Sequence, residues 1–155
     1  MNTYNGEKYL KEQLDSIFAQ EEVETHCVIR DDGSKDGTIE LLRFYEKQYP
    51  SRVTLLINEG HLGPSLSNQR VLEFADIERF EYVAFGDQDD FWLPAKMRVA
   101  IEHLKSLPTD KPRFYYSNLT VTDKDLNPRF LVYKKGQVTD SFNGCLTDFY
   151  ASCNT

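Results

Sequence analysis

The sequence lacks several features that other protein classes require. Its 155 residues include three cysteines, an odd number without CxxC spacing, so neither a disulfide framework nor a zinc knuckle is indicated. The histidines are scattered too, and His26 and His103 are interpreted as structural or surface residues. No apolar run approaches the roughly 20 residues of a membrane span, and the N-terminus does not resemble a signal peptide. We therefore expect reduced thiols and a cytoplasmic protein.

Basic residues are also in deficit. Eighteen Lys and Arg residues stand against 25 Asp and Glu residues, which gives a net charge of -7 and a pI near 5.0. Sequence-independent binding to DNA or RNA depends on a basic surface, so nucleic acid is not an expected partner. An anionic ligand would need a metal ion or local hydrogen-bond donors. With 40% hydrophobic residues, the chain can build a core, and we expect one domain over residues 1–155.

The sequence does contain a regular alternation of apolar patterns. Short β-prone runs are followed by polar loops and then by apolar residues at helical spacing. We expect strands at 27–29, 53–57, 82–85, 114–116 and 120–122, a turn at 125–128, and helices at 7–19, after 38, at 65–75, 95–104 and 141–149. This order predicts an α/β fold with a mainly parallel sheet and helices on both faces, in which right-handed crossovers bring the strand ends to one edge.

Four polar loops follow from this order at the carboxyl ends of the strands. They are residues 3–5, 31–34, 58–64 and 87–90. Open α/β sheets bind their ligands in the crevice beyond these strand ends. We therefore expect a single binding site that is assembled from the four loops.

The segment 85–92, FGDQDDFW, places three carboxylates within four residues. Such crowding is unfavourable unless a cation offsets the repulsion, although an acidic surface turn is the alternative. Mg²⁺ and Mn²⁺ prefer oxygen ligands, and in extended backbone Asp87 and Asp89 point the same way. We expect Asp89 to bind the metal, while Asp87 either assists or binds a sugar or ribose hydroxyl. Phe91 and Trp92 are expected to fasten the loop to the core.

Asp32 lies at another strand end, where its carboxylate can accept the N3–H of a uracil or thymine ring. Tyr4 can stack on such a ring. The alternative for the acids of segment 31–38, DDGSKDGT, is that they only cap the following helix, and for Asp36 this alternative is preferred.

Taken together, TYNG at 3–6, DDGSKDGT at 31–38, and DQDD at 87–90 with the following WLP and Lys96 resemble the family 2 glycosyltransferases of the GT-A fold. The form of the third motif is most similar to the bacterial rhamnosyltransferase-like branch, which builds cell-surface polysaccharides. The resemblance implies a Rossmann-like nucleotide-binding domain in which Asp87-x-Asp89 is the metal-binding DXD element. The nucleotide-sugar-binding residues that it implies are Thr3, Tyr4, Asn5, Glu7, Asp32, Asp87, Gln88 and Asp89.

The resemblance also implies a reaction. It is the metal-dependent, inverting transfer of a sugar from a UDP- or dTDP-linked donor to a saccharide or lipid-linked acceptor. A lipid-linked acceptor would bring the protein to the inner face of the membrane as a peripheral partner. The sugar, the base, the acceptor and the oligomeric state stay open.

The chain also departs from the family pattern. Family members begin with an apolar strand before the position of residues 3–5 and continue with an acceptor site and a general base. We therefore expect a fragment that lacks the first strand and the C-terminal acceptor part, with the general base beyond Thr155. Arg30 stands where the family generally has an apolar residue.

Two other functions are alternatives to this one. The first is a non-catalytic nucleotide-binding or interaction fragment, which would have the same donor site without the acceptor half. The second is an aspartyl-phosphate phosphatase, whose loop also carries Asp-x-Asp after a strand. Phe91 disfavours it, because a Thr or Val normally stands at that place.

Overall fold

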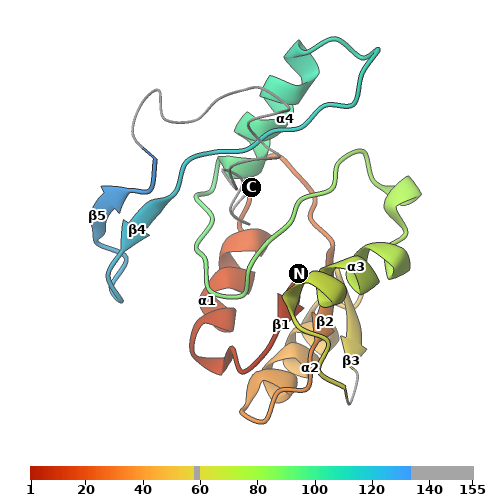
Figure 1. The fold of residues 1–155 in the computed structure, drawn as a ribbon, viewed down its shortest axis with the longest axis vertical. Helices are drawn as coiled ribbons and strands as arrows, with labels where there is room; N and C mark the ends of the chain where they lie inside the picture. Colours follow the sequence, from red (N-terminus) through yellow and green to blue (C-terminus); the bar gives the residue numbers. More distant parts are fainter. Residues whose placement is uncertain (58–59, 134–155) are drawn as a thin grey trace.

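The structure, a computed structural model, describes residues 1–57 and 60–133, and its centre is a three-stranded parallel sheet of order β1-β2-β3 (Figure 1). The strands of this sheet are β1 (Asn2–Thr3), β2 (Cys27–Asp31) and β3 (Val53–Ile57). The helices are α1 (Glu7–Phe18), α2 (Thr38–Gln48), α3 (Pro64–Phe74) and α4 (Lys96–Ser106), with the 3₁₀ turn η1 at Ile77–Arg79. A separate antiparallel pair consists of β4 (Thr120–Thr122) and β5 (Pro128–Leu131).

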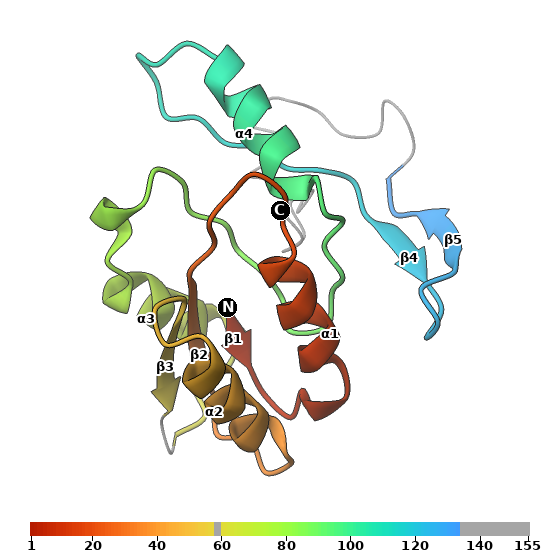
Figure 2. The same cartoon turned by 180° about the vertical axis from the view of Figure 1, so that it is seen from behind.

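Helices cover both faces of the central sheet, as the two opposite views show (Figures 1 and 2). α3 lies on one face, while α2 lies on the other with α1 packed beside it. The helical spacing of Leu10, Leu14 and Ile17 places these side chains on the inner stripe of α1, where they meet Ile29 of β2 and Leu42 of α2 in the core. The predicted α/β class with a parallel sheet is confirmed.

The register of the sheet aligns the ends of its strands. Thr3 of β1 pairs with Asp31 of β2, and Asp31 in turn pairs with Ile57 of β3. Because the three strands are parallel, the loops that follow them leave the sheet at the same edge. This is the edge where the polar loops were expected to gather.

Most of the predicted elements are confirmed, with ends that differ by a few residues. The predicted strand at 82–85 is wrong, because these residues form no strand. A strand needs a ladder partner, and the short β1 reaches only Arg30 and Asp31 of β2. A cavity, described below, lies between segment 82–85 and the start of β2. No ladder can form across that gap.

The predicted strand at 114–116 is also wrong. The Tyr115 ring instead stacks on His103 of α4, with 5.6 Å between the ring centroids. The segment therefore packs against α4 and does not pair with a strand. The predicted strand at 120–122 is confirmed as β4, and the predicted helix at 141–149 lies outside the described residues. Over 1–57 and 60–133, no helix has the length and apolar character that a membrane crossing requires.

Candidate functional site

The four predicted loops meet at the carboxyl edge of the sheet, and Gln88 makes one of the connections. The Tyr4 backbone N–H donates to Gln88 Oε1 at 2.9 Å, and Gln88 Nε2 donates to the Tyr4 carbonyl at 3.2 Å. A Cβ atom on Gly6 would lie 2.3 Å from Gln88 Oε1, so this approach depends on glycine at position 6. The acidic loop, residues 87–90, is thereby connected to the loop after β1.

Asp31 shapes the loop that follows β2. Its Oδ1 accepts hydrogen bonds from the backbone N–H of Gly33 (3.1 Å) and of Ser34 (2.9 Å), and Gly33 has φ of 90°, a value that favours glycine. Its Oδ2 accepts the hydroxyl of Thr3 at 3.0 Å. Thr3 is fully buried, so the structure places this predicted ligand-binding residue inside the fold, where it holds Asp31.

Asn5, Glu7 and Asp36 connect the starts of α1 and α2. Asn5 Oδ1 accepts the N–H of Lys35 at 2.8 Å, and Glu7 Oε2 accepts the N–H of Gly37 at 2.9 Å. The Asp36 carboxylate accepts the N–H of Thr38 at 3.1 Å and that of Glu7 at 3.2 Å. The N-cap of α2 is Gly37, with no side-chain cap, so Asp36 binds the first residues of α1 and α2 without standing at the N-cap that was expected of it, and these contacts fix the two loops that flank the site.

Asp32 lies at the centre of the site and is 2% exposed. Its Oδ1 accepts hydrogen bonds from the Arg30 guanidinium and from the backbone N–H of Leu62 (2.8 Å), and its Oδ2 accepts the N–H of Gly63 (2.8 Å). Burial by itself raises the pKa of this carboxyl, but the hydrogen bonds from Arg30, Leu62 and Gly63 outweigh burial and lower the pKa to about 2. Asp32 is therefore ionised at neutral pH.

Tyr4 and His61 lie beside Asp32. The two rings are 4.7 Å apart between centroids and are tilted by 49°. The Nδ1 atom of His61 lies 2.9 Å from Asp32 Oδ2, and 59% of the His61 side chain is exposed. An aromatic ring and a buried carboxylate thus both lie against the His61 imidazole.

The acidic loop carries its three carboxylates at different depths. Asp89 is exposed, whereas Asp87 and Asp90 are half-buried. Within the described part of the chain, the buried Oδ2 of Asp90 has no hydrogen-bond partner. Burial, with repulsion from Asp87 and Asp89, raises the pKa of Asp90 to about 7. The loop therefore holds negative charge that a cation would stabilise.

Trp92 holds this loop to the core, but Phe91 does not. Trp92 is 5% exposed and its backbone N–H donates to Ser16 Oγ at 3.0 Å, whereas Phe91 is 44% exposed. The prediction that both rings fasten the loop is therefore wrong for Phe91.

A metal ion would have to be shared with a ligand at this loop. Among residues 1–57 and 60–133, no group of three or more His, Cys, Asp or Glu side chains is arranged to hold a metal. Asp87 and Asp89 are two carboxylates with hard oxygen atoms, and Mg²⁺ commonly binds one or two protein carboxylates together with phosphate oxygens. The residues present fit a metal that a diphosphate helps to hold.

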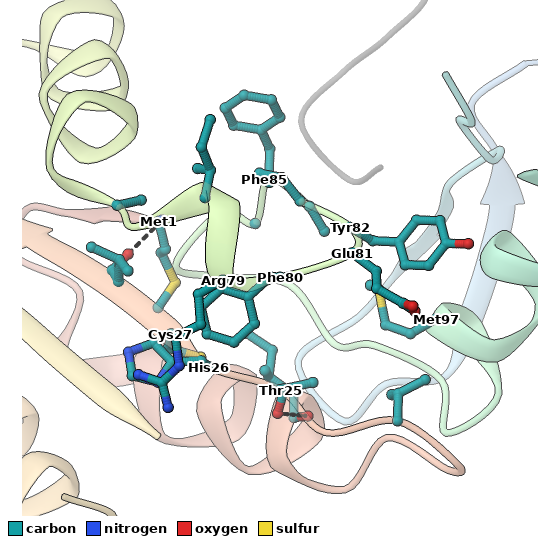
Figure 3. A pocket seen from close by; sticks show the side chains of 18 of the residues that line it. Met1, Thr25, His26, Cys27, Arg79, Phe80, Glu81, Tyr82, Phe85 and Met97 are labelled. Carbon is teal, nitrogen blue, oxygen red and sulfur yellow. Dashed lines mark hydrogen bonds between the residues drawn. The ribbon is translucent and has the colours of Figure 1, made fainter. Parts of the chain in front are cut away.

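A cavity of about 700 Å³ is lined by residues of β2, of α3 and of segment 79–86 (Figure 3). Its wall includes Met1, Cys27, Phe80, Phe85 and Met97, and it contains none of the eight predicted nucleotide-sugar-binding residues. The Met1 ammonium group reaches Val28 O at 3.0 Å at its margin. The lining is largely apolar, and the cavity is separate from the loop site.

Two residues of the site, Arg30 and His61, are absent from the predicted set. The signal for Arg30 is its charge within an apolar strand, because a buried charge needs a counter-ion and Asp32 is two residues away. His61 had no signal in the sequence beyond its place in a converging loop. Its contact with Tyr4 joins residues far apart in the chain.

The low pKa of Asp32 predicts a specific effect of acid. A carboxyl whose pKa is lowered by folding stabilises the fold above its unfolded pKa of 3.8, and that contribution is lost as the pH falls toward 2. We expect the stability difference between wild type and Asp32→Asn to shrink by about 1 to 2 kcal/mol between about pH 5 and about pH 2.5, allowing for solvent screening. Urea unfolding over this range measures the difference, and parallel pH profiles of the two proteins would contradict the assignment.

Comparison with known proteins gives the family. The model of glycosyl transferase family 2 matches residues 1–153. The chain is 37% identical over 105 residues to the dTDP-rhamnosyl transferase RfbG of Shigella flexneri, which covers 67% of this chain and 36% of the relative. It is 27% identical over 154 residues to the UDP-Glc:alpha-D-GlcNAc-diphosphoundecaprenol beta-1,3-glucosyltransferase WfgD of Escherichia coli, which covers 95% of this chain and 56% of the relative.

A solved structure agrees with these matches. The crystal structure of S. aureus TarS residues 1–349 in complex with UDP superposes with a TM-score of 0.59 at 25% identity, covering 83% of this chain and 41% of that one. The chain thus spans between about one third and somewhat over half of these proteins. The GT-A fold that the motifs implied is confirmed. The chain belongs to glycosyl transferase family 2.

Proposed function

We propose that residues 1–155 are the donor-binding part of a glycosyltransferase that transfers a sugar from a UDP- or dTDP-linked donor during polysaccharide synthesis. The observation that carries this proposal is the meeting of the loops at one edge of the sheet, where the Tyr4 backbone is hydrogen-bonded to Gln88 of the acidic loop and Asp32 is hydrogen-bonded to Leu62 and Gly63 of the loop after β3. The names of RfbG and WfgD include a dTDP-linked and a UDP-linked donor, which supports the same two classes here.

The base is proposed to bind at Asp32 and Tyr4. Asp32 is ionised and can accept the N3–H of a uracil or thymine ring, while the exposed ring of Tyr4 offers a stacking face. The contacts between Gln88 and the Tyr4 backbone hold this base site at a fixed place relative to Asp87 and Asp89. The diphosphate would then extend from the base toward the acidic loop.

Asp87 and Asp89 are proposed to hold Mg²⁺ or Mn²⁺ together with the diphosphate. A bound divalent ion neutralises negative charge on a departing nucleoside diphosphate. Asp90 has a different role, since its buried Oδ2 lies under the loop rather than at its surface, and this burial raises its pKa.

The transfer itself is proposed to proceed with inversion. An acceptor hydroxyl attacks the anomeric carbon from the face opposite the nucleotide, the bond between that carbon and the diphosphate oxygen breaks, and a carboxylate base takes the hydroxyl proton. We place that base outside residues 1–155. The acceptor is proposed to be a saccharide or a lipid-linked saccharide at the inner face of the membrane. The name of WfgD includes a lipid-linked saccharide as the acceptor of that enzyme.

Thermal unfolding tests the donor site. We expect UDP or dTDP with Mn²⁺ to raise the melting temperature by about 5 to 10 °C at a nucleotide concentration about 100 times the dissociation constant. Asp89→Ala should lose the part of the shift that depends on Mn²⁺, because one of the two loop carboxylates is gone. Asp110→Ala, at an exposed acid in the turn after α4, should keep the full shift.

No shift in a folded wild-type sample would overturn the proposal. A shift that survives Asp89→Ala unchanged would overturn the metal site alone. Nucleotide binding without any sugar transfer would agree with the alternative of a nucleotide-binding fragment.

A further inference from the structure

We propose that the His61 imidazole occupies the place of the nucleotide base, so that donor binding must displace it. This inference rests on the proposed base site at Asp32 and Tyr4. The imidazole already lies against both groups that the base is expected to contact. Its ring packs on Tyr4 at a centroid distance of 4.7 Å, and its Nδ1 lies 2.9 Å from Asp32 Oδ2.

Three of the acceptor positions of the Asp32 carboxylate are filled, and His61 stands in front of the fourth. Each carboxylate oxygen offers about two lone-pair sites. Oδ1 accepts from Arg30 and Leu62 N, while Oδ2 accepts from Gly63 N and lies 2.9 Å from His61 Nδ1, whose hydrogen bond is to the Asp32 backbone carbonyl at 3.3 Å. A base that donates its N3–H to Asp32 must therefore take the place of one of these four groups.

Three of the four groups cannot leave without disturbing the fold. Arg30 is 2% exposed and also donates to the Ser67 hydroxyl and to the Gly60 carbonyl. Leu62 and Gly63 contribute backbone N–H groups at the start of α3, where Gly63 precedes the helix. His61 is a side chain with 59% of its surface exposed, so rotation about its own χ angles can release it.

The His61 imidazole and the nucleotide base also have similar shapes. An imidazole and a pyrimidine are both flat single rings with a ring N–H, and both can pack on a tyrosine while donating to a carboxylate. His61 therefore occupies the space in front of the Asp32 carboxylate when the site has no nucleotide. Its loss should tighten nucleotide binding, because the base no longer competes with a side chain that is already in place.

Calorimetric titration of wild type and His61→Ala with UDP in the presence of Mn²⁺ tests this inference. One net hydrogen bond corresponds to about a 3- to 10-fold change in affinity, and we expect His61→Ala to bind UDP more tightly by that factor. Inorganic pyrophosphate with Mn²⁺ should bind both proteins equally, because it carries no base. His103→Ala is the matched control, since His103 is also an exposed imidazole stacked on a tyrosine, Tyr115, but lies on α4.

His61→Phe gives a second, independent readout. It keeps a ring against Tyr4 but has no N–H for Asp32, so its affinity for UDP should fall between those of wild type and His61→Ala. Unchanged or weaker UDP binding by His61→Ala, with wild type binding normally, would overturn the inference and leave the donor site standing. An absence of UDP binding by all the folded proteins would overturn the proposed function and, with it, this inference.

Discussion

Replacing Arg30 with methionine is expected to lower the free energy of unfolding by about 3 to 5 kcal/mol. The guanidinium is buried at 2% exposure and donates to the carboxylate of Asp32, which is itself 2% exposed. Methionine fills a similar length without a charge, so Asp32 would stay ionised in the interior with no cation beside it. Urea unfolding followed by circular dichroism measures the loss.

A matched control comes from a second arginine. Arg52 donates to the Thr25 carbonyl at 3.0 Å and to its hydroxyl at 2.6 Å, so Arg52→Met removes hydrogen bonds to neutral groups and should cost only about 1 to 2 kcal/mol. In a cycle with Asp32→Asn, the double variant should be less destabilised than the sum of the single variants, because each single change leaves one charged partner buried. Stability of Arg30→Met within about 1 kcal/mol of wild type would contradict this account.

The buried stripes of the fold could be read from the sequence because they depend on local spacing. Leu10, Leu14 and Ile17 recur at helical intervals, and the same residues form the inner face of α1. The prediction of a strand at 82–85 was wrong for a reason that the spacing of apolar residues cannot reveal. Strand formation depends on a ladder partner at the right distance, and β2 is separated from this segment by the cavity.

The site was predictable to the extent that loop order fixes it. Parallel strands bring Tyr4 and Asp32 to one edge whatever their side chains do, and the structure places them there. Gln88 follows no strand and is joined to this edge by the hydrogen bonds of its side chain with the Tyr4 backbone. The partners of Asp32 were not predictable in the same way. Its contact with His61 depends on the path of the loop after β3, and the burial of Thr3 depends on the direction in which its side chain leaves β1.

Replacing Trp92 with alanine is the second change with a large expected effect, about 3 to 5 kcal/mol of destabilisation. The indole is 5% exposed and belongs to the core cluster, and a Cβ atom on Gly86 would lie 3.2 Å from its Cζ2 atom. Removing the ring would leave a cavity under the acidic loop. Because this is the only tryptophan in the chain, unfolding should be followed by circular dichroism rather than by tryptophan fluorescence.

Two further variants show whether the loss of stability comes from the buried indole itself or from any change in this segment. Phe91→Ala, at the adjacent ring with 44% exposure, should change stability by only about 0.5 kcal/mol. Trp92→Phe keeps most of the apolar volume and removes an indole N–H that has no partner among the described residues, so it should cost less than Trp92→Ala.

The same ring should govern ligand binding if it positions the acidic loop. The Trp92 ring is buried in the core cluster with Leu10 and Leu14 of α1, and Asp87 and Asp89 stand on the loop just before it, so removing the ring would spread the positions of both carboxylates. We expect the Mn²⁺-dependent stabilisation by UDP to be lost in Trp92→Ala, reduced in Trp92→Phe and kept in Phe91→Ala. Loss of this stabilisation in Phe91→Ala, with Trp92→Phe unaffected, would show that the exposed ring, and not the buried one, holds the loop.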